Sequence, residues 1–224
     1  MILPRPVLGV VFDMDGLLVD TESIWRDAQM AESQARGHPL PLEVLHSLIG
    51  LPWEHSQLKL LAHFGDHFDA EDYLQAAIRR VIAIKTEGVA VKTGVVEMLD
   101  LLDALNLPRA IATSSTHEIV REHMGPSGLL PRFHAVMARG DYERAKPNPD
   151  PYLRAAEAIG IDPASCLALE DSHMGVRAAH AAGMMTVMVP DLLEATDEMH
   201  GLCVGVAETL HEVHSALSAQ AAKR

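Results

Sequence analysis

Residues 7–16 of the chain read VLGVVFDMDG, a run of mostly apolar residues that leads straight into two aspartates and a glycine. A short apolar run that ends in turn residues is typical of a strand buried on both faces, as in a parallel sheet. Side chains two positions apart on a strand point the same way, so Asp13 and Asp15 are expected to project together from its carboxyl end. Gly16 then allows a sharp turn. Two neighbouring carboxylates repel each other, and a bound cation or a shared proton relieves that repulsion.

Two other interpretations of this stretch stay open at this point. The first is an ordinary exit from a strand into a turn, which aspartate and glycine both favour. The second is a calcium-binding loop, because Asp13, Asp15, Gly16 and Glu22 have the spacing of four EF-hand positions. That loop would begin at Val11, where a carboxylate ligand belongs. The rest of the chain therefore has to decide between these interpretations.

The composition is that of a globular protein. The chain has 224 residues, of which 48% are apolar and 22% charged, and its net charge is −13. A negative charge of this size argues against nucleic acid or an anionic membrane as a partner, because both need a basic surface. An anionic substrate would have to find local positive charge, such as a metal ion or a few lysines. No apolar stretch approaches the roughly 20 residues that cross a bilayer.

Cysteine and histidine usage suggests neither disulfides nor a histidine metal site. The two cysteines, Cys166 and Cys203, sit in apolar surroundings, and the N-terminus has no signal-peptide pattern. We therefore expect a cytoplasmic protein with buried thiols. The thirteen histidines do not have the spacing of metal ligands, so structural or surface roles are predicted for them.

The order of helical and strand patterns predicts the fold class. From residue 22 to about residue 87 the apolar residues recur at helical spacing, so residues 17–90 are predicted to form an inserted all-helical cap domain. Residues 1–16 and 91–224 alternate between strand and helix. Strands are predicted there at residues 109–112, 134–137, 166–169 and 185–189. This alternation predicts an α/β core, a doubly wound parallel sheet of Rossmann-like type.

Polar residues follow four predicted strands or the loops after them. They are Asp13 with Asp15, Thr113 with Ser114, Lys146, and Glu170 with Asp171. The carboxyl ends of parallel strands share one edge, where such sheets bind ligands. Carboxylates suit Mg²⁺, while a lysine and a hydroxyl suit a phosphate. Residues 115–118 read STHE, which fits a capping box and places a helix N-terminus beside that phosphate.

The chain resembles the haloacid dehalogenase-like superfamily over nearly its full length. The motifs that carry the resemblance are FDMDGLLVDTE at 12–22, TSS at 113–115, KPNP at 146–149 and EDSHMGVRAAHAAG at 170–183. It is most similar to the sugar-phosphate phosphatases and β-phosphoglucomutase-like members that carry a helical cap after the first strand. The resemblance implies the same Rossmann-like core, a Mg²⁺ cofactor, a small phosphorylated metabolite as substrate, and a monomer.

The resemblance also implies a role for each site residue. Asp13 would be the nucleophile that forms an aspartyl-phosphate, and Asp15 the general acid and base. Mg²⁺ would be held by the Asp13 side chain, the Asp15 backbone carbonyl and Asp171, with Glu170 helping directly or through water. The transferring phosphoryl group would be held by Thr113, the Ser114 backbone N–H and Lys146.

The substrate-specificity loop of the family matches residues 50–55, so Trp53, Glu54 and His55 are the candidate substrate contacts of the cap. Mutase members carry an arginine at the position of Trp53, which grips the second phosphate of a bisphosphate. Its replacement here favours hydrolysis, although Trp53 could equally serve the core packing of the cap. We therefore expect a Mg²⁺-dependent phosphatase. A phosphomutase and a non-catalytic binding protein on the same fold remain as alternatives.

Overall fold

The computed structural model describes residues 1–48, 53–85 and 89–223. The chain divides into two compact units, Met1–Asp20 with Val89–Arg224, and Thr21–Gly88. We call the first the core unit and the second the helical unit. The sequence interpretation placed the two boundaries at residues 16/17 and 90/91. The segment after Gly16 stays with the core unit because Leu17, Leu18 and Val19 are buried and Val19 bridges to Val91.

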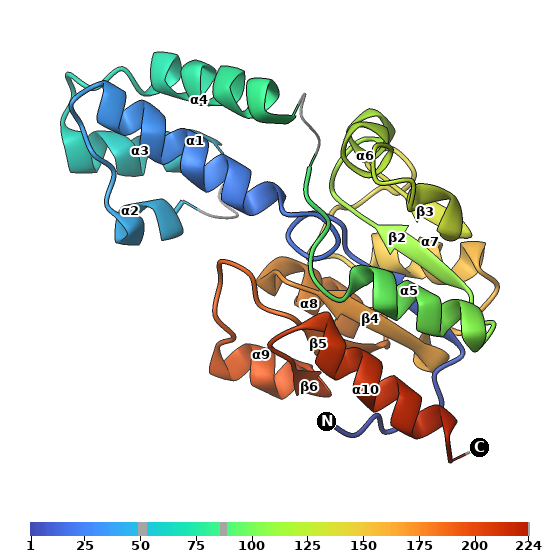
Figure 1. Ribbon diagram of the computed structural model, residues 1–224. Coiled ribbons are helices and arrows are strands. Elements are labelled where there is room, and N and C mark those ends of the chain that lie inside the picture. The colour runs from blue at the N-terminus through green and yellow to red at the C-terminus, as the bar shows by residue number, and fades with distance from the viewer. Residues whose placement is uncertain (49–52, 86–88, 224) are drawn as a thin grey trace. The chain divides into compact units, whose positions relative to one another are not determined.

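The core unit is built on one parallel sheet with the strand order β3-β2-β1-β4-β5-β6 (Figure 1). Strand β1 lies between β2 and β4, and Phe12 pairs with Ile111 on one side and Leu169 on the other. The chain moves outward from β1 through β2 to β3 and then returns to the opposite side of β1 as β4. A crevice for ligands forms where the strand order reverses in this way. The strands are β1 Gly9–Phe12, β2 Arg109–Ala112, β3 Ala135–Met137, β4 Cys166–Glu170, β5 Met185–Met188 and β6 Gly205–Val206.

Helices cover both faces of this sheet, as Figure 1 shows. Helices α5 and α10 pack together on one face, and α7 and α8 pack together on the other. Small buried side chains such as Ala110, Ala155 and Ala179 let the second pair approach the sheet closely. The helices of the core unit are α5 Val95–Ala104, α6 His117–Met124, α7 Asp150–Ala158, α8 His173–Ala181, α9 Asp197–Leu202 and α10 Leu210–Ala221.

The helical unit contains α1 Thr21–Ala35, α2 Leu42–His46, α3 Trp53–Phe64 and α4 Ala70–Lys85. Its own apolar cluster includes Leu45, Leu60, Phe68 and Tyr73, all buried. The Tyr73 hydroxyl donates to the Gln29 carbonyl at 3.2 Å and ties α4 to α1. Within its described residues this unit has helices and no strand, as its helical spacing predicts.

The predicted doubly wound parallel sheet is confirmed, and the differences lie at its margins. Strand β6 was not predicted, because two residues are too short to show a periodic pattern. Helix α6 begins one residue later than the capping box implies, because its N-cap is Thr116, whose hydroxyl accepts from the Ile119 N–H at 3.4 Å. The prediction of Ser115 as the cap was therefore wrong. Among the described residues, no helix is both long and apolar enough to span a bilayer.

Candidate functional site

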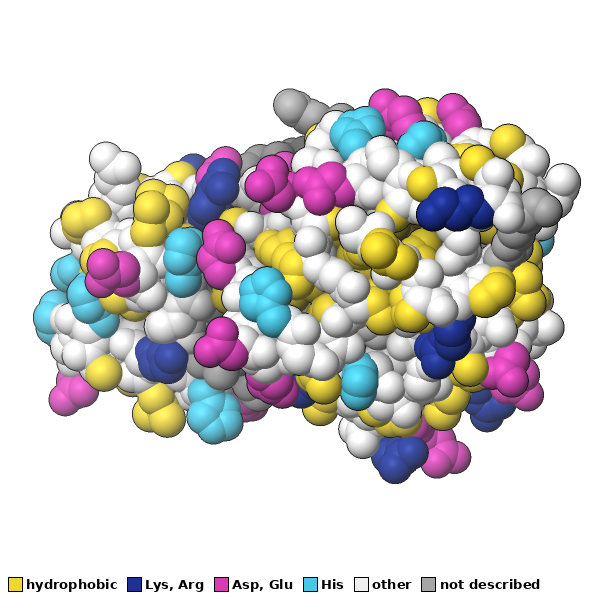
Figure 2. All heavy atoms as spheres, turned by 90° about the horizontal axis from the view of Figure 1, so that it is seen from below, with side chains coloured by type: hydrophobic (Ala, Val, Ile, Leu, Met, Phe, Trp, Pro, Cys, Tyr) yellow, Lys and Arg dark blue, Asp and Glu magenta, His cyan; other side chains and the backbone are white. Residues whose placement is uncertain are grey.

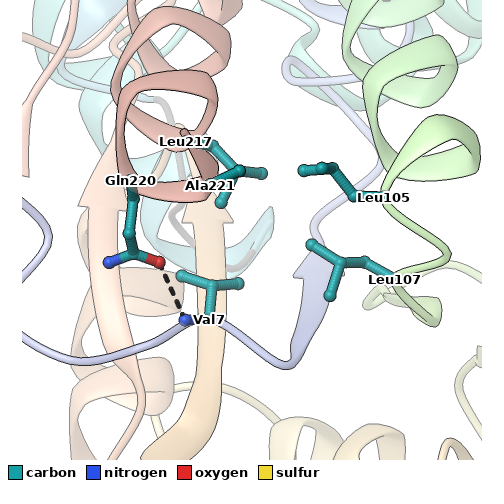
Figure 3. Close-up of a pocket in the computed structure, with 6 residues that line it drawn as sticks. All are labelled: Val7, Leu105, Leu107, Leu217, Gln220 and Ala221. Carbon is teal, nitrogen blue, oxygen red and sulfur yellow. Dashed lines mark hydrogen bonds between the residues drawn. The ribbon is translucent and has the colours of Figure 1, made fainter. Parts of the chain in front are cut away.

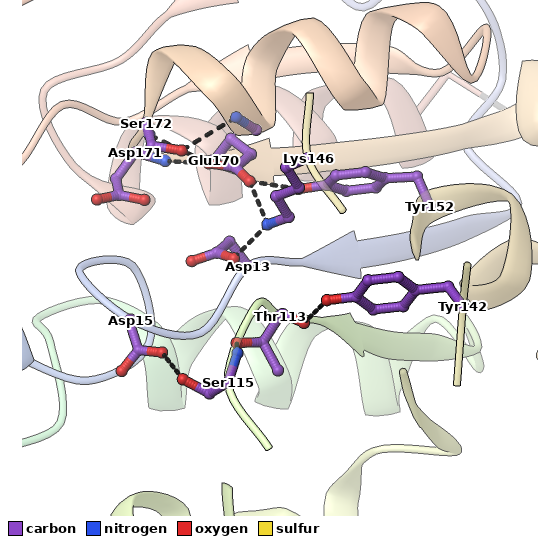
Figure 4. A network of polar contacts seen from close by, with 11 residues as sticks. Asp13, Asp15, Thr113, Ser115, Tyr142, Lys146, Tyr152, Glu170, Asp171 and Ser172 are labelled. Carbon is purple, nitrogen blue, oxygen red and sulfur yellow. Dashed lines mark hydrogen bonds and ion pairs between the residues drawn. The ribbon is translucent and has the colours of Figure 1, made fainter. Parts of the chain in front are cut away.

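The polar groups predicted at the strand ends do come together in the core unit (Figure 4). Asp13 follows β1, and its N–H donates to the Leu169 carbonyl of β4 at 2.9 Å. Thr113 follows β2, and its N–H donates to the Met137 carbonyl of β3 at 3.0 Å. Glu170 is the last residue of β4. The parallel register therefore lines up these three side chains at one edge of the sheet.

Lys146 lies between two of these carboxylates. Its ammonium donates to Asp13 Oδ1 and to Glu170 Oε1, the latter at 2.6 Å, and its side chain is only 6% exposed. The ammonium also lies 5.1 Å from the centre of the Tyr152 ring. A buried ammonium is costly unless it is paired, and here two carboxylates pair with it. The long loop between β3 and α7 thus delivers one positive charge to the centre of the acidic edge.

The Glu170 carboxylate is the most completely bonded group of the site. Besides Lys146, Oε1 accepts from the Tyr152 hydroxyl at 2.6 Å. Oε2 accepts from the N–H groups of Asp171 and Ser172, both at 3.1 Å, and from the Ser172 hydroxyl at 3.0 Å. Glu170 is fully buried, and both of its oxygens accept hydrogen bonds, as buried polar groups generally do. Its carboxylate therefore holds Lys146 and the start of α8 in fixed positions.

Two glycines make room for the carboxylates. A Cβ at Gly16 would lie 2.2 Å from Asp171 Oδ2, and φ at Gly16 is +82°, which side chains rarely adopt. A Cβ at Gly175 on α8 would lie 1.6 Å from Glu170 Oε1. Any larger residue would therefore push a carboxylate out of place at either position.

Burial and mutual repulsion shift the proton affinities of the site. Burial of Asp13, together with the charge of Glu170, raises the pKa of Asp13 to about 8, although Lys146 opposes this shift. Burial alone would lower the pKa of Lys146, but the charges of Asp13 and Glu170 raise it above its ordinary value. Lys146 is therefore a permanent cation, whereas the Asp13 carboxylate needs further positive charge nearby to be ionised at neutral pH.

The donor set fits a divalent cation. Asp13, Glu170 and Asp171 each offer a carboxylate oxygen, and these oxygens lie within 4.8 Å of one another. Lys146 donates to two of the three carboxylates, Asp13 and Glu170, so one ammonium is shared between two groups that can each carry a negative charge. Beside them, Asp191 Oδ2 is buried and has no hydrogen-bond partner among the described residues, while Oδ1 accepts from Lys92 at 2.6 Å. Oxygen-rich, under-neutralised sites of this kind suit Mg²⁺.

The Asp15 side chain is directed to a different set of partners. Its Oδ2 accepts from the Ser115 hydroxyl at 2.7 Å, and Oδ1 lies 3.2 Å from His123 Nδ1. The Asp15 carboxylate is not part of the group of oxygens that could hold a metal ion. The sequence interpretation missed both partners: Ser115 belongs to a recognised motif but was assigned to a helix cap, and His123 is one histidine among thirteen.

The two predicted phosphate-binding residues after β2 lie in the same loop. Thr113 is buried, its Oγ1 accepts from the Ser115 N–H at 3.0 Å, and its carbonyl accepts from the Tyr142 hydroxyl at 2.9 Å. Ser114 is exposed, and its carbonyl accepts from Arg139 Nε at 2.9 Å. A hydroxyl that accepts one bond still has its own proton to donate, so Thr113 can donate to an anion.

The three predicted substrate contacts of the cap lie on α3 in the helical unit. Trp53 Nε1 donates to Glu71 Oε2 at 3.1 Å, and the ring packs against the apolar cluster of that unit. Glu54 and His55 are exposed. Residues 50–52 of the matched loop lie outside the described residues. The packing role weighed for Trp53 is therefore present, and substrate contact by these three residues stays a prediction.

An apolar pocket of about 260 Å³ occurs elsewhere in the core unit (Figure 3). It lies before the start of β1, between the end of α5 and α10, and Gln220 is its only polar lining residue. Because its lining carries no charge, this pocket does not suit a phosphate.

On the face of the molecule in Figure 2, lysine and arginine side chains are scattered among acidic and uncharged ones.

Comparisons with known proteins agree with this geometry. The sequence pattern of the haloacid dehalogenase-like hydrolases matches residues 10–189. The fructose-1-phosphate phosphatase YqaB of Escherichia coli is 32% identical over 81% of this chain and 95% of its own. Hexitol phosphatase B of Escherichia coli is 28% identical over 85% of this chain and 86% of its own.

A solved structure extends the agreement to the fold. The HAD family hydrolase from Deinococcus radiodurans R1, solved with bound phosphate and sodium, superposes with a TM-score of 0.83. It is 28% identical, and the match covers 95% of this chain and 96% of that one. The resemblance inferred from the motifs is thereby confirmed, and the chain belongs to the haloacid dehalogenase-like hydrolase family.

Proposed function

We propose that the chain is a Mg²⁺-dependent phosphatase that hydrolyses a small phosphorylated metabolite, a sugar or polyol phosphate. The observation that carries the proposal is the meeting of Asp13, Lys146, Glu170 and Asp171 at the carboxyl edge of β1 and β4. Such a set can hold a cation and a phosphoryl group together. The relatives named as fructose-1-phosphate and hexitol phosphatases support this class of substrate.

The proposed reaction has two displacement steps. An Asp13 oxygen attacks phosphorus while the bond from phosphorus to the alcohol oxygen breaks, and Asp15 gives its proton to that oxygen. The products of this step are the free alcohol and a phosphoryl group on Asp13. A water molecule then attacks the same phosphorus, Asp15 takes a proton from it, and the bond between phosphorus and Asp13 breaks. The products of the second step are inorganic phosphate and the original enzyme.

The other residues of the site bind and orient. Thr113, the Ser114 N–H and Lys146 hold the oxygens of the phosphoryl group. Asp13 and Asp171, with the Asp15 carbonyl, would hold Mg²⁺, which supplies positive charge for the phosphate oxygens and for an ionised Asp13. Because both oxygens of the Glu170 carboxylate already accept hydrogen bonds, we place its contact with the metal through water. We propose the helical unit as the cap that selects the leaving group.

The test is phosphate release from a panel of phosphate esters, with Mg²⁺ or with a chelator. Suitable members are glucose 6-phosphate, fructose 1-phosphate and sorbitol 6-phosphate. We expect Mg²⁺-dependent release that Asp13→Asn lowers by at least about a thousandfold, because the nucleophile is lost. The matched control is Asp100→Asn, which changes an exposed aspartate on α5 that pairs with Arg132 and should leave release unchanged.

Three results would contradict the proposal. Full activity in Asp13→Asn would exclude the covalent mechanism. Interconversion of hexose phosphates that needs a sugar bisphosphate and releases no net phosphate would establish the phosphomutase instead. Binding of the esters without turnover would establish a binding protein.

A further inference from the structure

The carboxylate of Asp15 is held from two sides by residues that are distant from it in sequence. Ser115 Oγ donates to Oδ2 at 2.7 Å, and His123 Nδ1 lies 3.2 Å from Oδ1. An ionised carboxylate only accepts hydrogen bonds, so the imidazole must donate from Nδ1 when Asp15 is charged. One oxygen of Asp15 is therefore bonded to the loop before α6, and the other is bonded to α6 itself.

His123 occupies a position where an apolar residue would be expected. It lies on the inner face of α6 with Val120 and Met124, and all three are buried. His123 is also the only buried residue among the thirteen histidines, all of which lie in the described part of the chain. Burying an imidazole among apolar side chains is costly unless it is hydrogen-bonded, and the partner here is Asp15. Helix packing alone would favour leucine or methionine at this position.

The burial of His123 also limits what it can do. Its side chain is 3% exposed, so it acts through Asp15 rather than on a substrate. The last torsion of an aspartate is broad, and a carboxylate with a single partner rotates readily. Two donors on different oxygens remove that rotation.

We propose that Ser115 and His123 are positioning residues that fix the Asp15 carboxylate in the orientation needed for proton transfer to the leaving group. The inference rests on the proposed function, in which Asp15 protonates the alcohol oxygen. General acids contribute roughly a hundredfold to ten-thousandfold to such reactions, and a small displacement of the acid forfeits much of this. Alcohols that are poor leaving groups depend on that proton, whereas an acidic phenol leaves without it.

The experiment compares kcat/KM for two kinds of substrate in the full-length protein with Mg²⁺. The alkyl probes are glucose 6-phosphate, fructose 1-phosphate and sorbitol 6-phosphate, and the aryl probe is 4-nitrophenyl phosphate. We expect His123→Leu to lower kcat/KM about 10- to 100-fold for the alkyl phosphates, and less than about 3-fold for the aryl phosphate. His123→Asn, which can place an amide N–H where Nδ1 lies, should recover most of the loss.

Two further variants keep the test decisive if His123→Leu folds poorly. Ser115→Ala removes the donor to Oδ2 and should show the same dependence on the leaving group. In the Asp15→Asn background, His123→Leu should cause no additional loss, because the group that it positions is already absent. The control is His180→Leu on α8, which removes an exposed histidine whose Nδ1 bonds to the Leu202 carbonyl, and it should change neither substrate class.

The outcomes separate this inference from the proposed function. Equal losses on alkyl and aryl substrates would assign His123 a purely structural role and overturn the inference, as would unchanged kcat/KM in both His123→Leu and Ser115→Ala. In either case Mg²⁺-dependent hydrolysis by the wild type would still stand. Absence of hydrolysis by the wild type on every probe would instead overturn the proposed function, and the inference with it.

Discussion

Two groups of charged residues in this protein show opposite electrostatics. At the edge of the sheet, burial raises the pKa of Asp13, and Lys146 leaves the local negative charge incompletely neutralised. In the helical unit, hydrogen bonds from Arg80 and Arg36 lower the pKa of Glu32, which lies between them. Two arginines pair with the single carboxylate of Glu32, whereas the single ammonium of Lys146 is shared between the carboxylates of Asp13 and Glu170. An excess of buried negative charge destabilises the fold, and a cation bound beside the carboxylates would offset that cost.

The largest expected difference between the two groups comes from removing one cation from each. Lys146→Met would leave Asp13 and Glu170 buried without their ammonium, and we expect a loss of about 3–5 kcal/mol of unfolding free energy. Arg80→Met removes a 44% exposed cation from Glu32 and should cost at most about 1 kcal/mol. Urea unfolding in the presence of a chelator measures both. Similar losses for the two variants would remove the distinction between the groups.

The next effect concerns the space around the buried carboxylates. Gly175→Ala places a methyl group on Glu170 Oε1, and we expect a loss of about 1–3 kcal/mol through overpacking. Gly201→Ala on α9 is the matched control, because nothing lies within 4 Å of its Cβ position. Alanine there should be neutral or stabilise by up to about 1 kcal/mol. Thermal melts of the two variants should therefore shift in different directions, and equal shifts would contradict the tight packing of Glu170.

A smaller effect should appear when Mg²⁺ is added at different pH values. The pKa of Asp13 is raised to about 8, so the folded state keeps this proton at pH values where the unfolded state has already lost it. The free energy of unfolding therefore falls as the pH rises from the ordinary pKa of an aspartate to about 8. A bound cation favours the ionised form. Millimolar Mg²⁺ should therefore raise Tm by a few degrees at pH 8 and by less at pH 6.

Asp13→Asn is the control for this measurement, since it has no carboxyl group to titrate. Its Mg²⁺-induced shift should be small and nearly independent of pH. An equal shift in the wild type at both pH values would show that Asp13 does not compete with protons for the cation.

The smallest effect should come from the ion pairs that Glu32 makes in the helical unit. The pKa of Glu32 is lowered by Arg80 and Arg36, so its contribution to stability is present above its ordinary pKa and disappears as the pH falls through the lowered value. Glu32→Gln should cost less than about 1 kcal/mol at pH 7 and a smaller amount at pH 3. Urea unfolding at the two pH values measures this difference. A constant difference between wild type and variant would mean that the ion pairs do not stabilise the unit.

The local sequence was enough to predict several features. The run before Asp13 predicts a buried strand, and the helical spacing of residues 22–87 predicts an insertion without strands. Strand β2 was predicted at the residues where it occurs. Such features depend on the periodicity of neighbouring side chains, which a single chain segment contains in full. The motifs then indicated which strand ends carry the candidate site residues.

Only the tertiary structure decided which side chains meet at the site. Ser115 and His123 lie 100 and 108 residues after Asp15, and no local pattern relates them to it. Tyr152 reads as an ordinary buried residue of α7 until its hydroxyl is seen to donate to Glu170. The order of the parallel strands reverses at β1, since β2 and β3 lie on one side of it and β4 to β6 on the other. This reversal brings loops that are distant in sequence to one edge of the sheet. The sequence thus determined the chemical groups available at that edge, whereas long-range packing determined their hydrogen-bond partners, their burial and so their pKa values.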